Sequence, residues 1–317
     1  MTVFVTGSTG FLGKNLVSRL LGEGEDVVTF GRSFRMFPPY EAVHYCCDLS
    51  LPINGTPDGL FAKACRDHKP DVIFHLAGNP LSKLDNKKPH GIILDNIVST
   101  QKVLHHAPQG CRIILASTVI VYGDWLYNLP WDDSWVSYRP YKESDKTEPT
   151  SVYGMTKRAS ESLINIYTSM NKVSGVSLRM CATVGPNLTH GVIKDFIQKL
   201  QSPSEYLDVL GDEPGSKKPY CHIDDVVEAF ILMSKSDVTG EFNVLPDNAI
   251  TIKEVASAVM KGCGINKPIN WLGDGANWKG DNKIIDVNNS KLKSFGWEPK
   301  FPDSHGVIVD MVKRISQ

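Results

Sequence analysis

One tyrosine–lysine pair in the chain has the spacing of a proton-transfer site. Tyr153 and Lys157 stand four residues apart in a stretch with helical periodicity, so both side chains fall on one helix face. A free tyrosine has a pKa of about 10, and a neighbouring ammonium favours its phenolate. We therefore predict that Lys157 lowers the pKa of Tyr153 and that the pair exchanges a proton with a substrate hydroxyl.

The chain contains a second match to this spacing, in Tyr138 and Lys142. Pro140 lies between these two residues and would break a helix that carried them both. The helical pattern that holds Tyr153, in contrast, continues without proline through Ile166. We take Tyr153 and its lysine as the functional pair.

Two hydroxyl residues follow one another at the end of a predicted buried strand. The strand is expected over Arg112–Ser117, and Thr118 comes directly after it. Ligands of open α/β sheets bind beyond the carboxyl ends of the strands, so a hydroxyl there can hydrogen-bond a reacting oxygen. The alternative is that Ser117 and Thr118 only cap the strand end.

A glycine-rich loop stands at the start of the chain, between a predicted strand at Val3–Thr6 and a predicted helix at Lys14–Leu21. Glycines let the backbone turn sharply and approach a pyrophosphate, which the helix N-terminus then attracts. The strand and helix on either side make this spacing a dinucleotide-binding pattern. The loop residues expected at the cofactor are Gly7, Thr9, Gly10, Phe11, Leu12 and Gly13.

The residues after the next strand bear on which dinucleotide is bound. A carboxylate at the end of the predicted strand Val27–Phe30 would bind the ribose hydroxyls of NAD. The chain has Gly31 and Arg32 there, with Arg35 nearby, and a guanidinium can pair with the 2′-phosphate of NADP. We expect NAD or NADP, with NADP slightly favoured; Arg32 as a solvated loop residue is the alternative.

Strand-like and helical stretches alternate in the first half of the chain. Further buried strands are expected at Val72–Leu76 and Val176–Met180, and helices at Ile92–His106 and Ser151–Met170. This order predicts an α/β fold, a Rossmann-type doubly wound parallel sheet.

We expect two parts in the chain. Residues 1–177 would form the NAD(P)-binding Rossmann domain, to which residues 219–246 return. Residues 178–317 would form a smaller mixed α/β substrate-binding lobe built of short elements. The tryptophan-rich stretch Gly123–Pro149 is expected to be a loop that lines or covers the site, or else a surface elaboration without a role.

Composition narrows the class of protein. The chain has 317 residues and a net charge of −1, so we expect no binding to nucleic acid or to membranes. Its seven cysteines are scattered without pattern, which predicts free thiols in a reducing compartment and a cytoplasmic location. No zinc-ligand spacing occurs, so no metal site is expected.

Taken in order, these motifs resemble the extended short-chain dehydrogenases/reductases, in the NAD-dependent epimerase/dehydratase group. The resemblance covers nearly the whole chain. The segments that carry it are Gly7–Gly13, Asp48–Leu49, His75–Gly78, Ser117–Gly123, Tyr153 with Lys157, Leu178–Pro186, His222–Val226 and Phe295–Pro299.

The resemblance implies a role for each matching residue. Tyr153 is implied as the catalytic acid/base, Thr118 as the catalytic Ser/Thr that also contacts substrate, and Lys157 as the holder of the nicotinamide ribose. Lys218 stands where many members bind the substrate diphosphate through an arginine. The remaining residues implied at the cofactor are Arg32, Asp48, Leu49, Leu76, Ala77, Gly78 and Ser117.

Departures from the family pattern point to one reaction. Dehydratases of the group carry Asp-Glu directly after the catalytic threonine, and decarboxylases use a glutamate there, whereas this chain has Val119 and Ile120. Ala182 stands where epimerases often have an asparagine that contacts the substrate phosphate.

We expect a nucleoside-diphosphate-sugar 4-epimerase that transiently oxidises C4. The alternatives are an NADPH-dependent reductase of a 4-keto nucleotide sugar and, more remotely, a non-catalytic NADP(H) sensor. By analogy with the family, a homodimer is expected through Ile92–His106 and Ser151–Met170.

Overall fold

The structure is a computed structural model that describes residues 1–33, 42–51, 59–82, 89–125, 139–186, 188, 191–273 and 282–316. Its larger part is a seven-stranded sheet in the order β11-β6-β5-β4-β1-β2-β3, with every neighbouring pair parallel. The strands are β1 (Thr2–Thr6), β2 (Asp26–Gly31), β3 (Val43–Cys46), β4 (Val72–His75), β5 (Cys111–Thr118), β6 (Val173–Met180) and β11 (Gly240–Val244).

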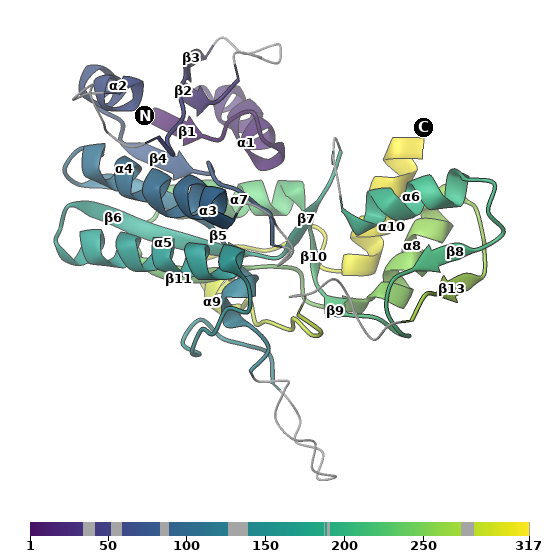
Figure 1. Ribbon diagram of the computed structural model, residues 1–317. Helices are drawn as coiled ribbons and strands as arrows, with labels where there is room; N and C mark the ends of the chain where they lie inside the picture. The colour runs from purple at the N-terminus through teal and green to yellow at the C-terminus, as the bar shows by residue number, and fades with distance from the viewer. Residues whose placement is uncertain are drawn as a thin grey trace.

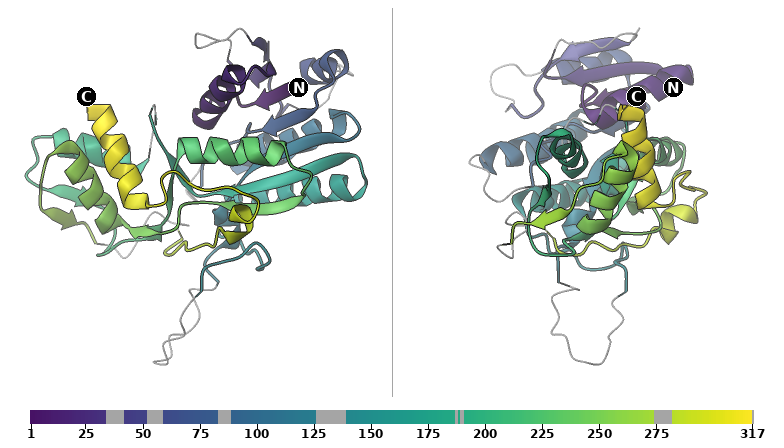
Figure 2. Two further views of the ribbon diagram at one scale, coloured as in Figure 1. Left: turned by 180° about the vertical axis from the view of Figure 1, so that it is seen from behind. Right: turned by 90° about the vertical axis from the view of Figure 1, so that its right-hand side faces the viewer.

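Helices cover both faces of this sheet (Figures 1 and 2). One face carries α1 (Phe11–Gly22) and α7 (Ile223–Ser234); the other carries α2 (Leu60–His68), α3 (Pro89–Ile93), α4 (Ser99–His106) and α5 (Val152–Ser169). Strand residues alternate between two apolar cores: Val3 and Val5 pack with Leu16 of α1, whereas Phe4 packs with Phe61 of α2. The predicted Rossmann-type doubly wound sheet is confirmed.

The strand order reverses between β1 and β4, and the backbone after these two strands packs closely. Gly7 has φ +67, and a Cβ on it would lie 2.7 Å from the amide nitrogen of Ala77. The Thr6 hydroxyl accepts hydrogen bonds from the amides of Leu76 and Ala77, at 3.2 and 3.1 Å. A crevice at such a reversal is where open α/β sheets bind ligands.

A second lobe lies beside the sheet and has its own apolar core (Figure 1). Its helices α6 (Val192–Gln201), α8 (Ile252–Cys263) and α10 (Ser304–Ser316) have 10, 12 and 13 residues. The expectation of short elements was wrong for these helices, because each buries an apolar stripe in the shared core. The short elements are β7 (Ala182–Val184), β8 (Leu207–Val209), β9 (Lys217–Lys218), β10 (Tyr220–His222), β12 (Ile250–Thr251) and β13 (Ile269–Trp271). The short helix α9 (Ser290–Lys293) instead packs Leu292 into the core of the large sheet.

The chain crosses between the two lobes more than once. After β10 it returns to the seven-stranded sheet, where α7 packs on one face and β11 forms the edge beside β6. Buried Asp225 in α7 then ties down the C-terminal segment, since its carboxylate accepts from the amides of Lys300 and Phe301 at 2.8 and 3.1 Å. The division into a cofactor domain and a substrate lobe stays a prediction.

Some expectations concern residues that the structure describes only in part. Arg35 and positions 126–138 of the tryptophan-rich stretch lie outside the described residues. In the part of the chain that is described, all seven cysteines are free thiols and no cluster of His, Cys, Asp or Glu could hold a metal ion. None of the described helices is long and apolar enough to cross a membrane.

Candidate functional site

The N-terminus of helix α5 packs against the turn that follows β5. The Ser151 hydroxyl caps the helix by accepting from the amide of Gly154 at 3.1 Å. A Cβ on Gly154 would lie 3.2 Å from Ile120 Cγ2 and 2.9 Å from Pro149 Cβ, so only glycine allows this close approach. The contact places Tyr153, in the first turn of α5, beside the end of β5.

Tyr153 and Thr118 share a hydrogen bond across this contact. The Thr118 hydroxyl also accepts from the amide of Ile120 at 3.2 Å, which caps the 3₁₀ turn Val119–Tyr122. Thr118 therefore holds the turn and contacts Tyr153 with the same oxygen. The predicted association of these two residues is present.

The expected electrostatic effect of Lys157 on Tyr153 is wrong for the structure as it stands. Burial raises the pKa of Tyr153 to about 12, and the hydrogen bond from Thr118 opposes that rise only in part. Burial also lowers the pKa of Lys157 to about 8, against the charge of Glu161. Four-residue spacing puts two side chains on one face but does not bring their charged ends together, and here the ammonium lies elsewhere.

The Lys157 ammonium lies at the end of β4. A Cβ on Gly78 would come within 3.1 Å of its Nζ and within 2.7 Å of Asn96 Oδ1. Asn96 is buried in a π-helical turn, Leu94–Val98, which joins α3 to α4. Its Oδ1 accepts from the amide of Asn79 at 2.7 Å, and its Nδ2 donates to Thr156 at 2.8 Å. Sequence reasoning missed Asn96, because a single asparagine within a helical pattern carries no signal.

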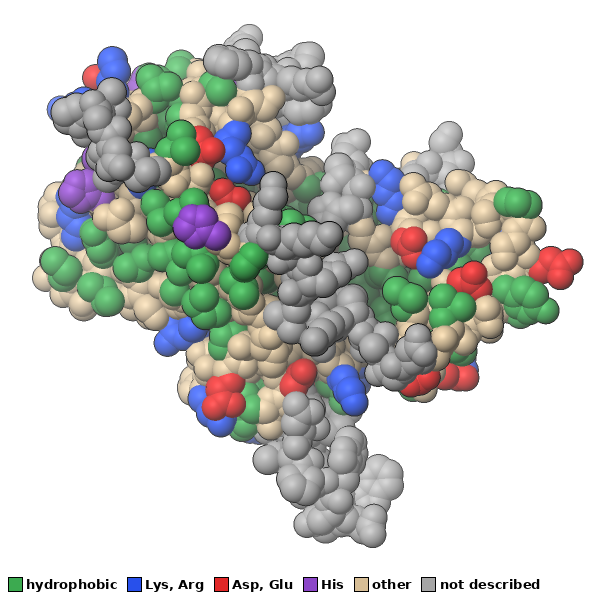
Figure 3. Space-filling view, in the orientation of Figure 1, with side chains coloured by type: hydrophobic (Ala, Val, Ile, Leu, Met, Phe, Trp, Pro, Cys, Tyr) green, Lys and Arg blue, Asp and Glu red, His purple; other side chains and the backbone are tan. Residues whose placement is uncertain are grey.

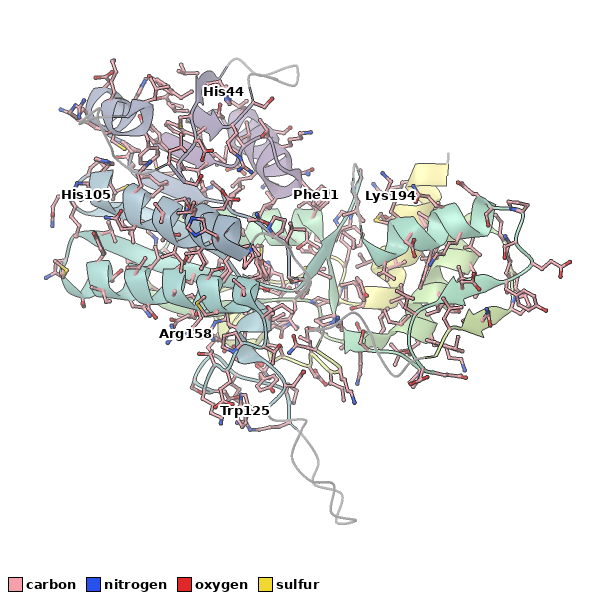
Figure 4. All side chains as sticks on the ribbon, in the orientation of Figure 1. Phe11, His44, His105, Trp125, Arg158 and Lys194 are labelled. Atoms are coloured by element: carbon pink, nitrogen blue, oxygen red, sulfur yellow. The ribbon has the colours of Figure 1, made fainter. Side chains whose placement is uncertain are left out.

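A pocket of about 200 Å³ opens beside the glycine loop. Nine of the residues expected at the cofactor line it: Gly7, Thr9, Gly10, Arg32, Asp48, Leu49, Leu76, Ala77 and Gly78. Phe11 and Leu12 pack instead against the core, and Gly13 lies under the loop, where a Cβ would come 2.3 Å from the Gly7 carbonyl oxygen. Figure 4 shows Phe11 at the start of α1, on the side facing the second lobe.

Arg32 stands at this pocket with a carboxylate on either side. Its side chain is 64% exposed, and its Nη1 lies 3.4 Å from Asp95 Oδ1. Burial raises the pKa of Asp48, but hydrogen bonds from Ser50 and the charges of Arg32 and Lys102 outweigh it, so the pKa lies below its usual value. The pocket thus holds two carboxylates and one guanidinium.

Ser117 does not face this pocket. Its hydroxyl donates to Glu161 Oε1 at 2.6 Å, and its expected place at the cofactor stays a prediction. Successive strand residues point to opposite faces, and Ser117 points toward α5. Lys218 lies on β9, where it pairs with Ile250 of β12.

Comparison with known proteins identifies the family of the chain. Residues 3–244 match the model of the NAD dependent epimerase/dehydratase family. The chain belongs to this family. It is therefore an enzyme of the extended short-chain dehydrogenase type, as the resemblance implied.

Several members of the family are similar over nearly the whole chain. UDP-glucuronic acid decarboxylase 6 of Arabidopsis thaliana is 29% identical over 95% of this chain and 84% of its own length. UDP-glucose 4-epimerase of Halalkalibacterium halodurans is 26% identical over 97% and 93%. A crystal structure of a UDP-galactose 4-epimerase has a TM-score of 0.79 and 27% identity, covering 100% of this chain and 99% of that one. The Thermus thermophilus UDP-glucose 4-epimerase, with a TM-score of 0.82 and 24% identity over 99% of both chains, shares the fold.

The raised pKa of Tyr153 predicts how the cofactor-free enzyme titrates. We expect the Tyr153 phenol to keep its proton through pH 10 and to ionise at about pH 12. Thr118→Val should raise this pKa further, because the hydrogen bond from Thr118 lowers it. The measurement is the phenolate absorbance of the wild type as a function of pH. Subtracting the same curve for Tyr153→Phe leaves the titration of Tyr153 alone. A difference titration with a midpoint at or below pH 9 would contradict the geometry.

Proposed function

We propose that the protein is an NAD-dependent 4-epimerase of a UDP-linked hexose. The observation that carries this proposal is the hydrogen bond between Thr118 and Tyr153 at the end of β5, followed by two apolar residues. Val119 is buried and Ile120 packs in a small apolar cluster with Tyr122. Elimination and decarboxylation in related enzymes use carboxylates at these positions, and none is present here. Relatives include enzymes named UDP-glucose 4-epimerase and UDP-glucuronate 4-epimerase.

The residues around the pocket fit a dinucleotide. A side chain on Gly7 would fill the crevice against β4, so the loop leaves bare backbone for a pyrophosphate. Lys157 at Gly78 would hold the ribose next to the reacting ring. When bound, NAD supplies a hydride acceptor for sugar C4 and a positive charge that lowers the pKa of a nearby phenol. Tyr153 then removes the proton of the 4-hydroxyl and later returns it, while Thr118 orients the oxygen.

The charges around Arg32 favour NAD over NADP. A 2′-phosphate placed on this guanidinium would also meet Asp95 and Asp48, whereas free ribose hydroxyls can donate to carboxylates. Arg32 was the reason to prefer NADP as the cofactor and to consider a 4-keto-sugar reductase. Its pairing with Asp95 weakens the case for both of these alternatives. The presence of Thr118, Tyr153 and Lys157 together argues against a non-catalytic NADP(H) sensor, because a sensor does not need these catalytic residues.

Calorimetric titration of the two dinucleotides tests the choice of cofactor. We expect the wild type to bind NAD at least about tenfold more tightly than NADP, a difference of about 1.4 kcal/mol, because the pocket carboxylates repel the 2′-phosphate. Asp95→Asn should narrow that preference, with Asp67→Asn on the distant helix α2 as the control. Preferential binding of NADP that Arg32→Ala abolishes would refute this assignment.

Replacement of the tyrosine tests the reaction itself. Tyr153→Phe should lower the rate of 4-epimer interconversion at least about 100-fold while NAD binding persists, because proton transfer alone is lost. Tyr167→Phe changes a tyrosine of the same helix that packs in the core and should keep wild-type activity. UDP-glucose, UDP-galactose and UDP-glucuronate, followed by proton NMR, are substrates that appear in the names of several relatives. More than a tenth of the activity left in Tyr153→Phe would contradict the role.

We also propose that the enzyme is a homodimer through α5. Met155, Ile166 and Met170 are 41%, 53% and 67% exposed and recur on one helix face. Apolar side chains gather over the helical layer in Figure 3. A second copy would cover this face, so sedimentation at micromolar concentration should give twice the mass of the chain. Ile166→Glu should yield a folded monomer, and a monomeric wild type would exclude the dimer.

A further inference from the structure

A buried ion pair lies behind the candidate active site. Glu161, on α5 one helical turn beyond Lys157, has 0% of its surface exposed. Its carboxylate accepts from Arg179 Nε at 2.9 Å and Nη2 at 2.8 Å. The Ser117 hydroxyl donates to the same carboxylate at 2.6 Å. Charges buried this deeply persist only when they are paired and hydrogen-bonded, and both conditions hold here.

The ion pair reaches the chain on both sides of Thr118. Ser117, directly before it, is held by Glu161, and Tyr122, four residues after it, accepts from Arg179 Nη1 at 3.0 Å. The Tyr122 hydroxyl in turn donates to Asn243 of β11 at 2.8 Å. One carboxylate–guanidinium unit therefore fixes both ends of the turn that presents Thr118.

Glu161 lies on the same face of α5 as Lys157. Residues four apart on a helix are neighbours, so Glu161 stands beside the stem of Lys157. Burial disfavours the ammonium of Lys157, and the charge of Glu161 opposes that effect. His75 on β4 also interacts with this lysine: burial lowers the pKa of His75 to about 3, and the charge of Lys157 lowers it further. Arg179 on β6 lies against the Glu161 carboxylate.

We propose that Glu161 is a positioning residue that fixes Thr118 and Lys157 relative to each other through its buried contacts with Arg179 and Ser117. It touches neither substrate nor cofactor. The inference rests on the proposed function in taking Thr118 and Lys157 as members of the active site. Its consequence is that the Glu161 carboxylate favours the ammonium form of Lys157 against the effect of burial.

The test removes the charge of Glu161 and follows Lys157 directly. Glu161→Gln keeps the size of the side chain and its bond with Ser117 but leaves Arg179 unpaired. The double variant Glu161→Gln/Arg179→Met removes both charges and guards against misfolding. Arg158→Gln is the matched control, because Arg158 lies on the same helix with its Nη1 3.7 Å from Glu161 and its side chain 38% exposed. Figure 4 labels Arg158 on α5.

Two measurements are made on the variants that keep the wild-type circular dichroism spectrum. In the cofactor-free protein, the ¹³Cε resonance of Lys157, assigned by its loss in Lys157→Met, reports the lysine pKa. We expect this pKa to fall by about one unit in both Glu161 variants and to stay unchanged in Arg158→Gln. In the epimerase assay, the alkaline limb of the pH profile should move to lower pH by the same amount, since the ammonium is lost earlier.

A structural role alone would give a different result. An unshifted Lys157 titration, with activity reduced equally at every pH, overturns the proposal. The proposal is also overturned if the double variant keeps both the wild-type activity and the wild-type pKa of Lys157. The lysine titration needs neither substrate nor cofactor, so a wild type without epimerase activity would refute the proposed function and leave this test standing.

Discussion

The packing of α5 against the turn after β5 is the contact on which the candidate site depends. It exists because Gly154 has no side chain to hold the helix away from Ile120 and Pro149. Tyr153 stands one residue before this glycine and so meets Thr118 at the strand end. The parallel sheet then brings the ends of β1 and β4, with the glycine loop, to the same edge. Local glycine geometry places Tyr153 at the end of β5, and the sheet order places the pocket at the ends of β1 and β4.

Burial and charge act against each other throughout this region. Burial alone favours neutral forms, and it leaves Tyr153 protonated and Lys157 with a lowered pKa in the cofactor-free enzyme. Ion pairing opposes this effect of burial and keeps buried groups charged, as in the pair of Glu161 and Arg179. Removing one member of such a pair typically costs about 3–5 kcal/mol, because the other is left buried and uncompensated.

The features that sequence could predict are those that depend on neighbours along the chain. Buried strands, amphipathic helices and the glycine loop follow from periodicity and local backbone demands, and the sheet followed from their order. Asn96, Glu161 and Arg179 were missed because their partners lie 17 to 60 residues away and only the fold brings them together. The role of Tyr153 stays a prediction, and its pKa differs from the expected one, since helical spacing fixes a face and not the position of a charge. The bond of Ser117 to Glu161 could not be predicted for the same reason, because Glu161 lies 44 residues further along the chain.

The central claim is that one bound cofactor takes hydride from sugar C4 and returns it to the same carbon. The direct measurement is to incubate the purified enzyme, without added reductant, with a UDP-hexose that carries deuterium at C4. We predict that both C4 epimers appear and that each keeps deuterium at C4, because the hydride never leaves the site. Deuterium released on free dinucleotide, a product that has lost carbon dioxide, or no epimer from UDP-glucose, UDP-galactose or UDP-glucuronate would contradict the account.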